Sequence, residues 1–253
     1  MLLFPTASGG GSAATAVGCN PTIRGFESPS PLFKMKLRAI TPKDYRLIIE
    51  SDEKVYPTSN PVTLDVIKQW YSKNPEFGMI YENNGIEGTC IAIPLNSHGW
   101  NKLINGKLAE SEMNEKTIFD NSRDKEIGIH IYHIERLNPK IKEFYKTALK
   151  DLSGIVNRLR QTNKELGVIG FSALAVTIPG INLFEKKFNC KERSYICSEN
   201  ILAKKGNLIV VDTKSESIEN KLKEGYRFVN KCKMLVLFPS EKSVVWKYFL
   251  KHL

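Results

Sequence analysis

The chain has 253 residues, enough for one sizeable core or for one domain with appendages. Its hydrophobic content of 42% and charged content of 25% are ordinary for a soluble globular protein. No apolar run approaches the roughly 18 residues of a membrane span, so an integral membrane protein is not expected. The formal net charge of +10 is compatible with a polyanionic partner. Because the basic residues of the C-terminal quarter alternate with acids and form no stripe, a solvated surface is favoured over a nucleic-acid footprint.

The cysteines predict no disulfide framework and no zinc site. Their number is odd and none of them has Cys-x-x-Cys spacing, which favours a reducing compartment and a cytoplasmic location. The five residues are Cys19, Cys90, Cys190, Cys197 and Cys232.

Residues 1–34 are rich in Gly, Ser, Ala, Thr and Pro and contain almost no acids. This composition predicts a disordered leader and fits a secretory signal poorly, because no apolar core precedes a cleavage site. Two alternatives remain for its origin: an organellar transit peptide, or translation that starts at Met35.

The first part of the folded region alternates short strands and helices. A strand over 37–40 precedes a helix that Thr41 caps, with Asp44 three residues later to reach back. A second helix opens at Asn60-Pro61 and carries apolar residues on one face. Residues 77–81 and 88–94 form a predicted β-hairpin, because Asn84-Gly85 is a strong turn signal. Residues 95–125 are polar and form an insertion.

The central part contains two strands that flank a long helix. Residues 126–137 are strand-like and residues 166–176 have the apolar character of a buried strand. The helix between them has helical spacing of its apolar residues, which are Ile141, Phe144, Ala148, Leu149, Leu152, Ile155, Val156 and Leu159. A short helix over 177–188 follows the second strand.

The last part contains a hairpin over 195–202 and 208–212, then a helix to about residue 226, a strand over 234–238 and a helix over 243–253. We therefore expect a domain over 35–212 and a C-terminal helix-strand-helix extension over 213–253 that packs on it.

The order of elements over about residues 37–212 resembles the layout of the GNAT superfamily of acyl-CoA N-acyltransferases. Residues 177–186, Thr-Ile-Pro-Gly-Ile-Asn-Leu-Phe-Glu-Lys, resemble the signature Asn-x-x-Ala-x-x-Leu-Tyr-Glu-Lys of that superfamily. The resemblance implies an α/β (α+β) fold with a mixed, mostly antiparallel central sheet flanked by helices. It also implies acetyl-CoA as a co-substrate.

In that family the strand that matches 126–137 diverges from its neighbour, and a glycine-rich loop then binds the pyrophosphate at the start of the long helix. Here Lys142 keeps the cation, whereas Tyr145 and Thr147 replace both glycines. One interpretation is that the helix begins at Asn138-Pro139 and absorbs the loop. The other is a modified loop that binds phosphates with lysines. The resemblance assigns the coenzyme to Arg136, Leu137, Lys140, Lys142, Tyr145, Lys146, Thr147, Thr177 and Phe184.

Acyl transfer to an amine needs a base, donors for the oxyanion and an acid for the leaving thiolate. The strand over 126–137 carries His130, His133 and Glu135, and either histidine could titrate near neutral pH. Strand alternation places His133 and Glu135 on one face and His130 on the other, and we prefer the pair His133 and Glu135 as base. Phe184 stands where the family has a tyrosine that protonates the thiolate. Tyr145 and Tyr195 are candidate substitutes.

The resemblance thus implies an acetyl-CoA-dependent N-acetyltransferase whose acceptor is a primary amine of a small molecule or a protein. The alternative is a catalytically inactive GNAT-like binding or regulatory module. A nucleic-acid partner is a third and weaker hypothesis, and no membrane partner and no metal are expected.

Overall fold

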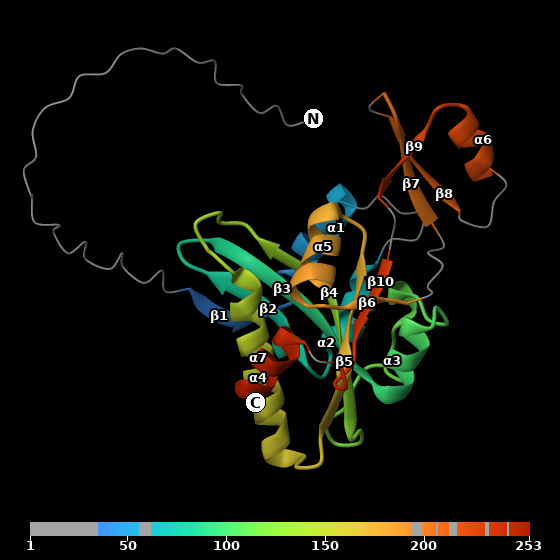
Figure 1. The fold of residues 1–253 in the computed structure, drawn as a ribbon. Helices are drawn as coiled ribbons and strands as arrows, with labels where there is room; N and C mark the ends of the chain where they lie inside the picture. Colours follow the sequence, from blue (N-terminus) through green and yellow to red (C-terminus); the bar gives the residue numbers. More distant parts are fainter. Residues whose placement is uncertain are drawn as a thin grey trace, which may run out of the picture. The chain divides into compact units, whose positions relative to one another are not determined.

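The computed structural model describes residues 35–55, 62–193, 199–205, 207–212, 217–230, 233–241 and 243–253 (Figure 1). Three predictions lie outside these residues: the leader over 1–34, the start of a helix at residues 60–61, and Tyr195 as a candidate acid. No helix among the described residues is long and apolar enough to cross a membrane.

A seven-stranded, mostly antiparallel sheet forms the centre of the fold, with the strand order β1-β2-β3-β4-β5-β10-β6. Among the described residues, β4 and β5 are the only neighbouring strands of this sheet that run parallel. The strands are β1 (Lys36–Ala39), β2 (Gly78–Glu82), β3 (Ile86–Asn96), β4 (Glu126–Arg136), β5 (Gly167–Ala175), β6 (Lys191–Glu192) and β10 (Lys233–Leu237). A mixed, mostly antiparallel sheet confirms the fold class expected from the sequence.

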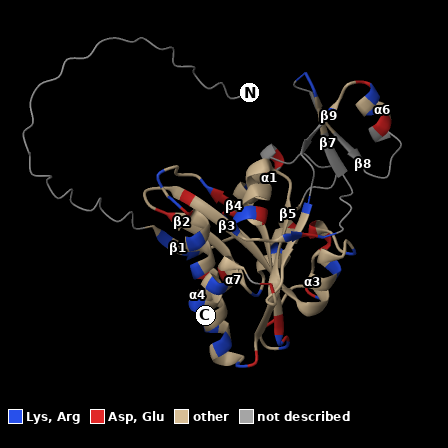
Figure 2. Cartoon of the chain, viewed as in Figure 1, with Lys and Arg blue, Asp and Glu red and all other residues tan. Residues whose placement is uncertain are grey.

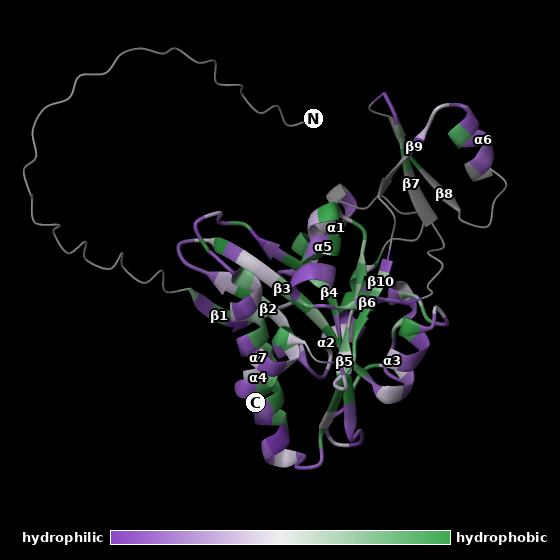
Figure 3. Ribbon diagram, viewed as in Figure 1, coloured by the Kyte–Doolittle hydropathy of each residue, from purple (hydrophilic) through white to green (hydrophobic). Residues whose placement is uncertain are grey.

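Helices cover both faces of this sheet. The helices that belong to it are α1 (Tyr45–Val55), α2 (Leu64–Tyr71), α3 (Ser97–Ile104), α4 (Phe144–Thr162), α5 (Ile178–Asn182) and α7 (Val244–Lys251). On one face, the Phe171 ring of β5 packs at 5.0 Å from Phe249 of α7, and Tyr81 of β2 donates a hydrogen bond to Asp151 of α4 at 2.9 Å. Figure 1 shows α4 beside α7, and Figure 3 shows green hydrophobic and purple hydrophilic residues on α4.

The opposite face is covered by α1, α2 and α3. Trp70 of α2 packs at 5.0 Å from the ring of Tyr132 in β4, and Ile48 of α1 lies near Ile91 of β3. Because helices cover both faces of the sheet, every residue of β3 from Gly88 to Asn96 is buried.

The local turn signals of the sequence are confirmed where they fall on described residues. The hairpin between β2 and β3 turns at Asn84 and Gly85, whose φ angles are 60° and 145°. Both values lie in the region that asparagine and glycine tolerate best. The start of α1 follows the expected cap, since the Thr41 amide donates to the Asp44 carboxylate at 2.8 Å.

Asp44 also accepts two hydrogen bonds from Arg38, at 2.7 and 2.8 Å. This ion pair lowers the pKa of Asp44 from 3.8 to about 2. A carboxyl group with a lowered pKa stabilises the fold above its unfolded-state pKa, and this contribution disappears as the pH falls through the folded-state value. Asp44→Asn should therefore lower the free energy of unfolding by about 1–2 kcal/mol at pH 7 and by much less near pH 2.

Urea unfolding at both pH values measures this difference. Asp65→Asn is the matched control, because its pair with Lys68 is exposed and such pairs contribute little. A loss for the Asp44 variant that is the same at both pH values would contradict the assignment.

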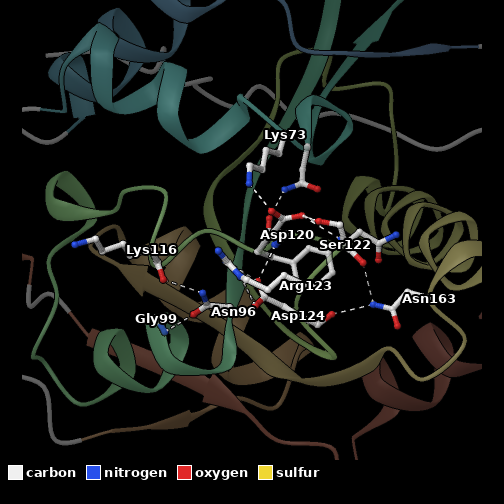
Figure 4. A network of polar contacts seen from close by, with 12 residues as sticks. Lys73, Asn96, Gly99, Lys116, Asp120, Ser122, Arg123, Asp124 and Asn163 are labelled. Atoms are coloured by element: carbon white, nitrogen blue, oxygen red, sulfur yellow. Dashed lines mark hydrogen bonds and ion pairs between the residues drawn. The ribbon is translucent and has the colours of Figure 1, made fainter.

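The insertion between β3 and β4 is held at both ends by side chains (Figure 4). Asn96 caps α3 through the amide of Gly99 at 2.8 Å and donates to the Lys116 carbonyl at 2.9 Å. Asp120 accepts from Lys73, and Asn163 donates to the Asp124 carbonyl at 2.8 Å. The polar composition of the insertion thus encodes a fixed structure, which includes the 3-10 turn η2 (Glu110–Glu112).

The C-terminal part divides between two sheets. Strands β7 (Glu199–Lys204), β8 (Asn207–Asp212) and β9 (Arg227–Asn230) form a separate sheet, and α6 (Ser217–Lys223) lies between β8 and β9 in the chain. By contrast, β10 pairs with β5 and β6 inside the central sheet. The predicted elements occur in the expected order, but β9 was not predicted, and each sheet combines strands from before and after residue 212. A buried strand between β5 and β6 makes residues 233–237 part of the central core.

Candidate functional site

The parallel strands β4 and β5 separate halfway along their length. Their pairing runs from Glu126 opposite Gly167 to His130 opposite Ser172 and ends there, although both strands continue. Backbone groups of a strand point alternately to its two neighbours, so some amides of β4 beyond His130 face the gap. These amides could polarise a carbonyl group that enters it.

A cavity of about 130 Å³ lies in this gap, and we call it the strand-gap cavity. It is lined by Glu110, Ile131, Tyr132, His133, Ile134, Ala173, Leu174, Ala175, Val176, Thr177, Gly180 and Phe184. Most of these residues come from the diverging ends of β4 and β5. Thr177 and Phe184, which the sequence assigned to the coenzyme, both line the cavity. Thr177 also caps α5 through the amide of Gly180 at 3.1 Å.

The loop before α4 is retained, because α4 begins at Phe144 and not at Pro139. The guanidinium of Arg136 donates to the Ile141 carbonyl at 2.8 Å and holds the loop over 137–143. The last loop residue, Glu143, has a φ angle of 51°, a conformation that glycine would adopt without strain. The interpretation in which the helix absorbs the loop is therefore wrong, whereas binding of phosphates by the lysines of the loop stays a prediction.

A second cavity, the α4–α5 groove, lies at the N-terminus of α4 and has a volume of about 590 Å³. It is lined by Ile134, Arg136, Glu143, Phe144, Tyr145, Pro179, Asn182, Leu183, Lys186 and Lys187. Ile134 lines the strand-gap cavity as well, so the two cavities adjoin. A helix N-terminus together with three cationic side chains attracts phosphate groups. Figure 2 shows further Lys and Arg residues in blue along α4.

The coenzyme residues expected from the sequence fall in different places. Arg136 and Tyr145 line the groove, whereas Leu137 lines a cavity on the other side of β4. Lys140 and Lys142 are exposed on the loop and line neither the groove nor the strand-gap cavity.

Two further residues that were predicted to bind the coenzyme, Lys146 and Thr147, lie in the first turn of α4. Lys146 pairs with Glu143 at 2.6 Å, and Thr147 is half-buried. The groove cations Lys186 and Lys187 were not predicted, although the Glu-Lys-Lys run at the end of the signature-like segment contains them.

His133 lies between the strand-gap cavity and a third cavity, which we call the α1-side cavity. This cavity has a volume of about 220 Å³ and is lined by Leu47, Ile48, Glu50, Ser51, Ile80, Thr89, Ile91, His133, Glu135 and Leu137. The Nε2 atom of His133 lies 3.2 Å from Glu135 Oε2. The structure thus brings together the pair preferred from the sequence, and its imidazole contacts both spaces.

The predicted placement of His130 on the opposite face from His133 is wrong. The pairing of β3 with β4 shifts at Tyr132, where the cross-strand pairs are Ile91 with His133, Ala92 with Ile131, and Ile93 with His130. The extra residue is a β-bulge, which reverses the alternation of side chains beyond it. His130 and His133 therefore share the face covered by α1, α2 and α3.

His130 is fully buried and does not line any of the three cavities. Its Nδ1 atom lies 3.0 Å from the Ser172 hydroxyl, and its Nε2 atom lies 2.7 Å from Glu110 Oε1. Ser172 in turn accepts from the Trp100 indole at 3.0 Å. Glu110, and not His130, lines the strand-gap cavity. Sequence reasoning missed Glu110, because an acid in a polar insertion gives no local signal.

Position 184, where the family resemblance leads us to expect a tyrosine, holds a phenylalanine. Phe184 packs at 4.9 Å from Phe188, and neither ring can donate a proton. Tyr145 lines the groove and lies at 6.0 Å from the same Phe188 ring. Burial raises the pKa of the Cys90 and Cys190 thiols to about 12, so neither is suited to act as a nucleophile. The described residues contain no cluster that could hold a metal ion.

No protein-family model matches the sequence, and no curated protein matches it either. Similar solved structures include Arabidopsis thaliana NAA60 in complex with acetyl-CoA, with 11% identity, a TM-score of 0.41, and coverage of 81% of this chain and 99% of that one. A mosquito arylalkylamine N-acetyltransferase (like 5b) has 12% identity and a TM-score of 0.39 over 81% of this chain and 100% of its own.

The loading GNATL domain of CurA from Lyngbya majuscula has 14% identity and a TM-score of 0.38 over 57% of this chain. The match spans 66% of that domain, just under two thirds of its length. The order of the elements, the divergence of β4 and β5, and the loop before α4 agree with the GNAT layout that the sequence resembles.

Proposed function

We propose that this chain is an N-acetyltransferase that transfers the acetyl group of acetyl-CoA to a primary amine. One observation carries the proposal: a cation-lined groove at the N-terminus of α4 adjoins the cavity between the diverging strands, and His133 stands at the far side of that cavity. Acetyl-CoA is an elongated polyanion with a thioester at one end, so its phosphates suit the groove and its thioester suits the strand-gap cavity. The acceptor amine would occupy the α1-side cavity.

In this arrangement the phosphates of the coenzyme lie in the α4–α5 groove, near Arg136, Lys186 and Lys187. The acyl end lies in the strand-gap cavity, where β4 amides donate to the oxyanion of the tetrahedral intermediate. His133 removes a proton from the ammonium group of the acceptor, and Glu135 orients the imidazole.

The α1-side cavity favours a cationic acceptor. It carries the carboxylates of Glu50 and Glu135 beside the apolar side chains of Leu47 and Leu137. An ammonium group on an apolar body, from a small molecule or from a protein, would suit both features.

Calorimetric titration of the full chain with acetyl-CoA tests the proposal. We expect a dissociation constant of roughly micromolar, that is a binding free energy of about −8 kcal/mol. An absence of binding up to about millimolar concentration would overturn it and leave a catalytically inactive GNAT-like module, the alternative inferred from the sequence.

Lys186→Glu should weaken acetyl-CoA binding by about tenfold, because a cation of the groove is replaced by an anion that repels phosphates. Lys142→Glu should have a smaller effect, since Lys142 is exposed and does not line the groove. Calorimetry at low and high salt measures the dissociation constants, and salt should reduce the difference.

Lys116→Glu in the exposed part of the insertion is the matched control for net charge. If Lys116→Glu and Lys186→Glu weakened binding equally, only the long-range field of the protein would be acting, and the placement of the phosphates would be wrong.

A further inference from the structure

Glu110 has the only carboxyl side chain among the described residues that line the strand-gap cavity. It comes from η2 in the insertion between β3 and β4, whereas most other lining residues come from β4, β5 and α5. Its side chain is 18% exposed, and one of its oxygens accepts from His130 at 2.7 Å. His130, which does not line the cavity, thus holds the side chain of Glu110 at the cavity wall.

A chain of hydrogen bonds holds the His130 ring. The Trp100 indole can only donate, so Ser172 Oγ accepts from it, and we assign the hydroxyl proton of Ser172 to the contact with His130 Nδ1. His130 then carries its own proton on Nε2 and donates it to Glu110. In this assignment the Ser172 hydroxyl, both ring nitrogens of His130 and Glu110 Oε1 all have hydrogen-bond partners. The buried imidazole thereby orients the Glu110 carboxyl group.

We propose that Glu110 carries a proton from the acceptor nitrogen to the coenzyme A sulfur, and that His130 is its positioning residue. This inference rests on the proposed function. The need for such a group arises because Phe184, which lines the same cavity, has no proton to give to the leaving thiolate.

The acceptor nitrogen loses two protons during the transfer. His133 takes one proton from the ammonium group, and the free amine nitrogen forms a bond to the thioester carbon. The attacking nitrogen then loses a second proton to Glu110, the carbon–sulfur bond breaks with its electron pair on sulfur, and Glu110 passes this proton to the sulfur. The products are the amide and the free thiol, with the first proton on His133.

The complex of the protein with coenzyme A, one of the two products, tests this inference even though the acceptor is not identified. If the Glu110 carboxylate lies against the thiol, its negative charge disfavours the thiolate and raises the thiol pKa of bound coenzyme A. Glu110→Gln should therefore lower that thiol pKa by roughly one unit while coenzyme binding persists. The measurement is the ultraviolet absorbance of the thiolate as a function of pH, in the complex of the full chain with free coenzyme A.

Glu112→Gln is the matched control, because Glu112 lies in the same turn, is exposed and does not line the cavity. For His130, alanine should lower the thiol pKa, whereas glutamine, whose amide can occupy the position of Nε2, should keep the value of the unchanged protein. A merely structural role of His130 would change thermal stability and leave the thiol pKa unaffected.

An identical thiol pKa in the unchanged protein and in Glu110→Gln would overturn this inference and leave the proposed function intact. A failure of the unchanged protein to bind coenzyme A would overturn both.

Discussion

His133→Ala is expected to reduce kcat by roughly a hundredfold or more while the dissociation constant of acetyl-CoA stays unchanged. His133 is 21% exposed at the side-chain level and lies 3.2 Å from Glu135, between the strand-gap cavity and the α1-side cavity. No other described histidine lines either cavity. Removal of the imidazole therefore removes the proposed base but leaves the groove in which we place the coenzyme.

The turnover of the unchanged protein should rise with pH, because only a neutral imidazole accepts a proton. This rise should be lost in His133→Ala. Release of coenzyme A from acetyl-CoA, recorded at several pH values with a set of primary amines, measures both effects.

His98→Ala is the matched control, since His98 lies exposed on α3. Wild-type turnover and an unchanged pH profile in His133→Ala would mean that the base is another residue. Failure of Glu135→Gln to change the turnover would contradict the role of Glu135 in orienting the imidazole.

Gly128→Ala is expected to lower the free energy of unfolding by about 3 kcal/mol, the largest effect on stability that we predict. A Cβ atom at this position of β4 would lie 2.1 Å from Cγ of Trp100 and 2.6 Å from its Cβ. Trp100 cannot move away easily, because its ring is buried, packs at 5.5 Å from Phe238 and is hydrogen-bonded to Ser172. Either the indole or the strand must shift.

Urea unfolding, fitted with the same m-value for each variant, measures the loss of unfolding free energy. Gly154→Ala is the control. Gly154 lies inside α4, where the nearest atom to an added Cβ is the flexible end of Arg158 at 3.7 Å. Alanine there should be neutral or stabilising by about 0.5–1 kcal/mol. Similar losses in the two variants would show that contact with Trp100 is not the cause.

Gly128→Ala should affect the candidate site as well as the stability of the fold. Trp100 begins the hydrogen-bond chain that runs through Ser172 and His130 to Glu110. A displaced indole should release Ser172, so this variant should also change the thiol pKa of bound coenzyme A in the direction of Glu110→Gln.

Several parts of the candidate site could be predicted from the sequence because they depend on short-range patterns. The strand with His133 and Glu135, the long helix after it and the short helix with Phe184 follow from the spacing of apolar residues. The pair of His133 with Glu135 requires only that both side chains lie on one face, two positions apart, beyond the bulge.

Other parts could not be predicted, for identifiable reasons. A bulge at Tyr132 depends on how β3 and β4 pair, and no residue of β4 alone signals it. The start of α4 at Phe144 depends on the contact of Arg136 with the Ile141 carbonyl, which competes with the good helix-start signal at Asn138-Pro139.

The order of most elements, the turn at Asn84-Gly85 and the cap at Thr41 could be predicted, since each depends on residues a few positions apart. The contact of Glu110 with His130, twenty residues away, and the entry of β10 into the central sheet between β5 and β6 could not be predicted in this way. The physical reason is that these contacts form between surfaces that exist only after the strands have paired. Their free energy comes from burial and cross-strand hydrogen bonds, which local propensity does not encode.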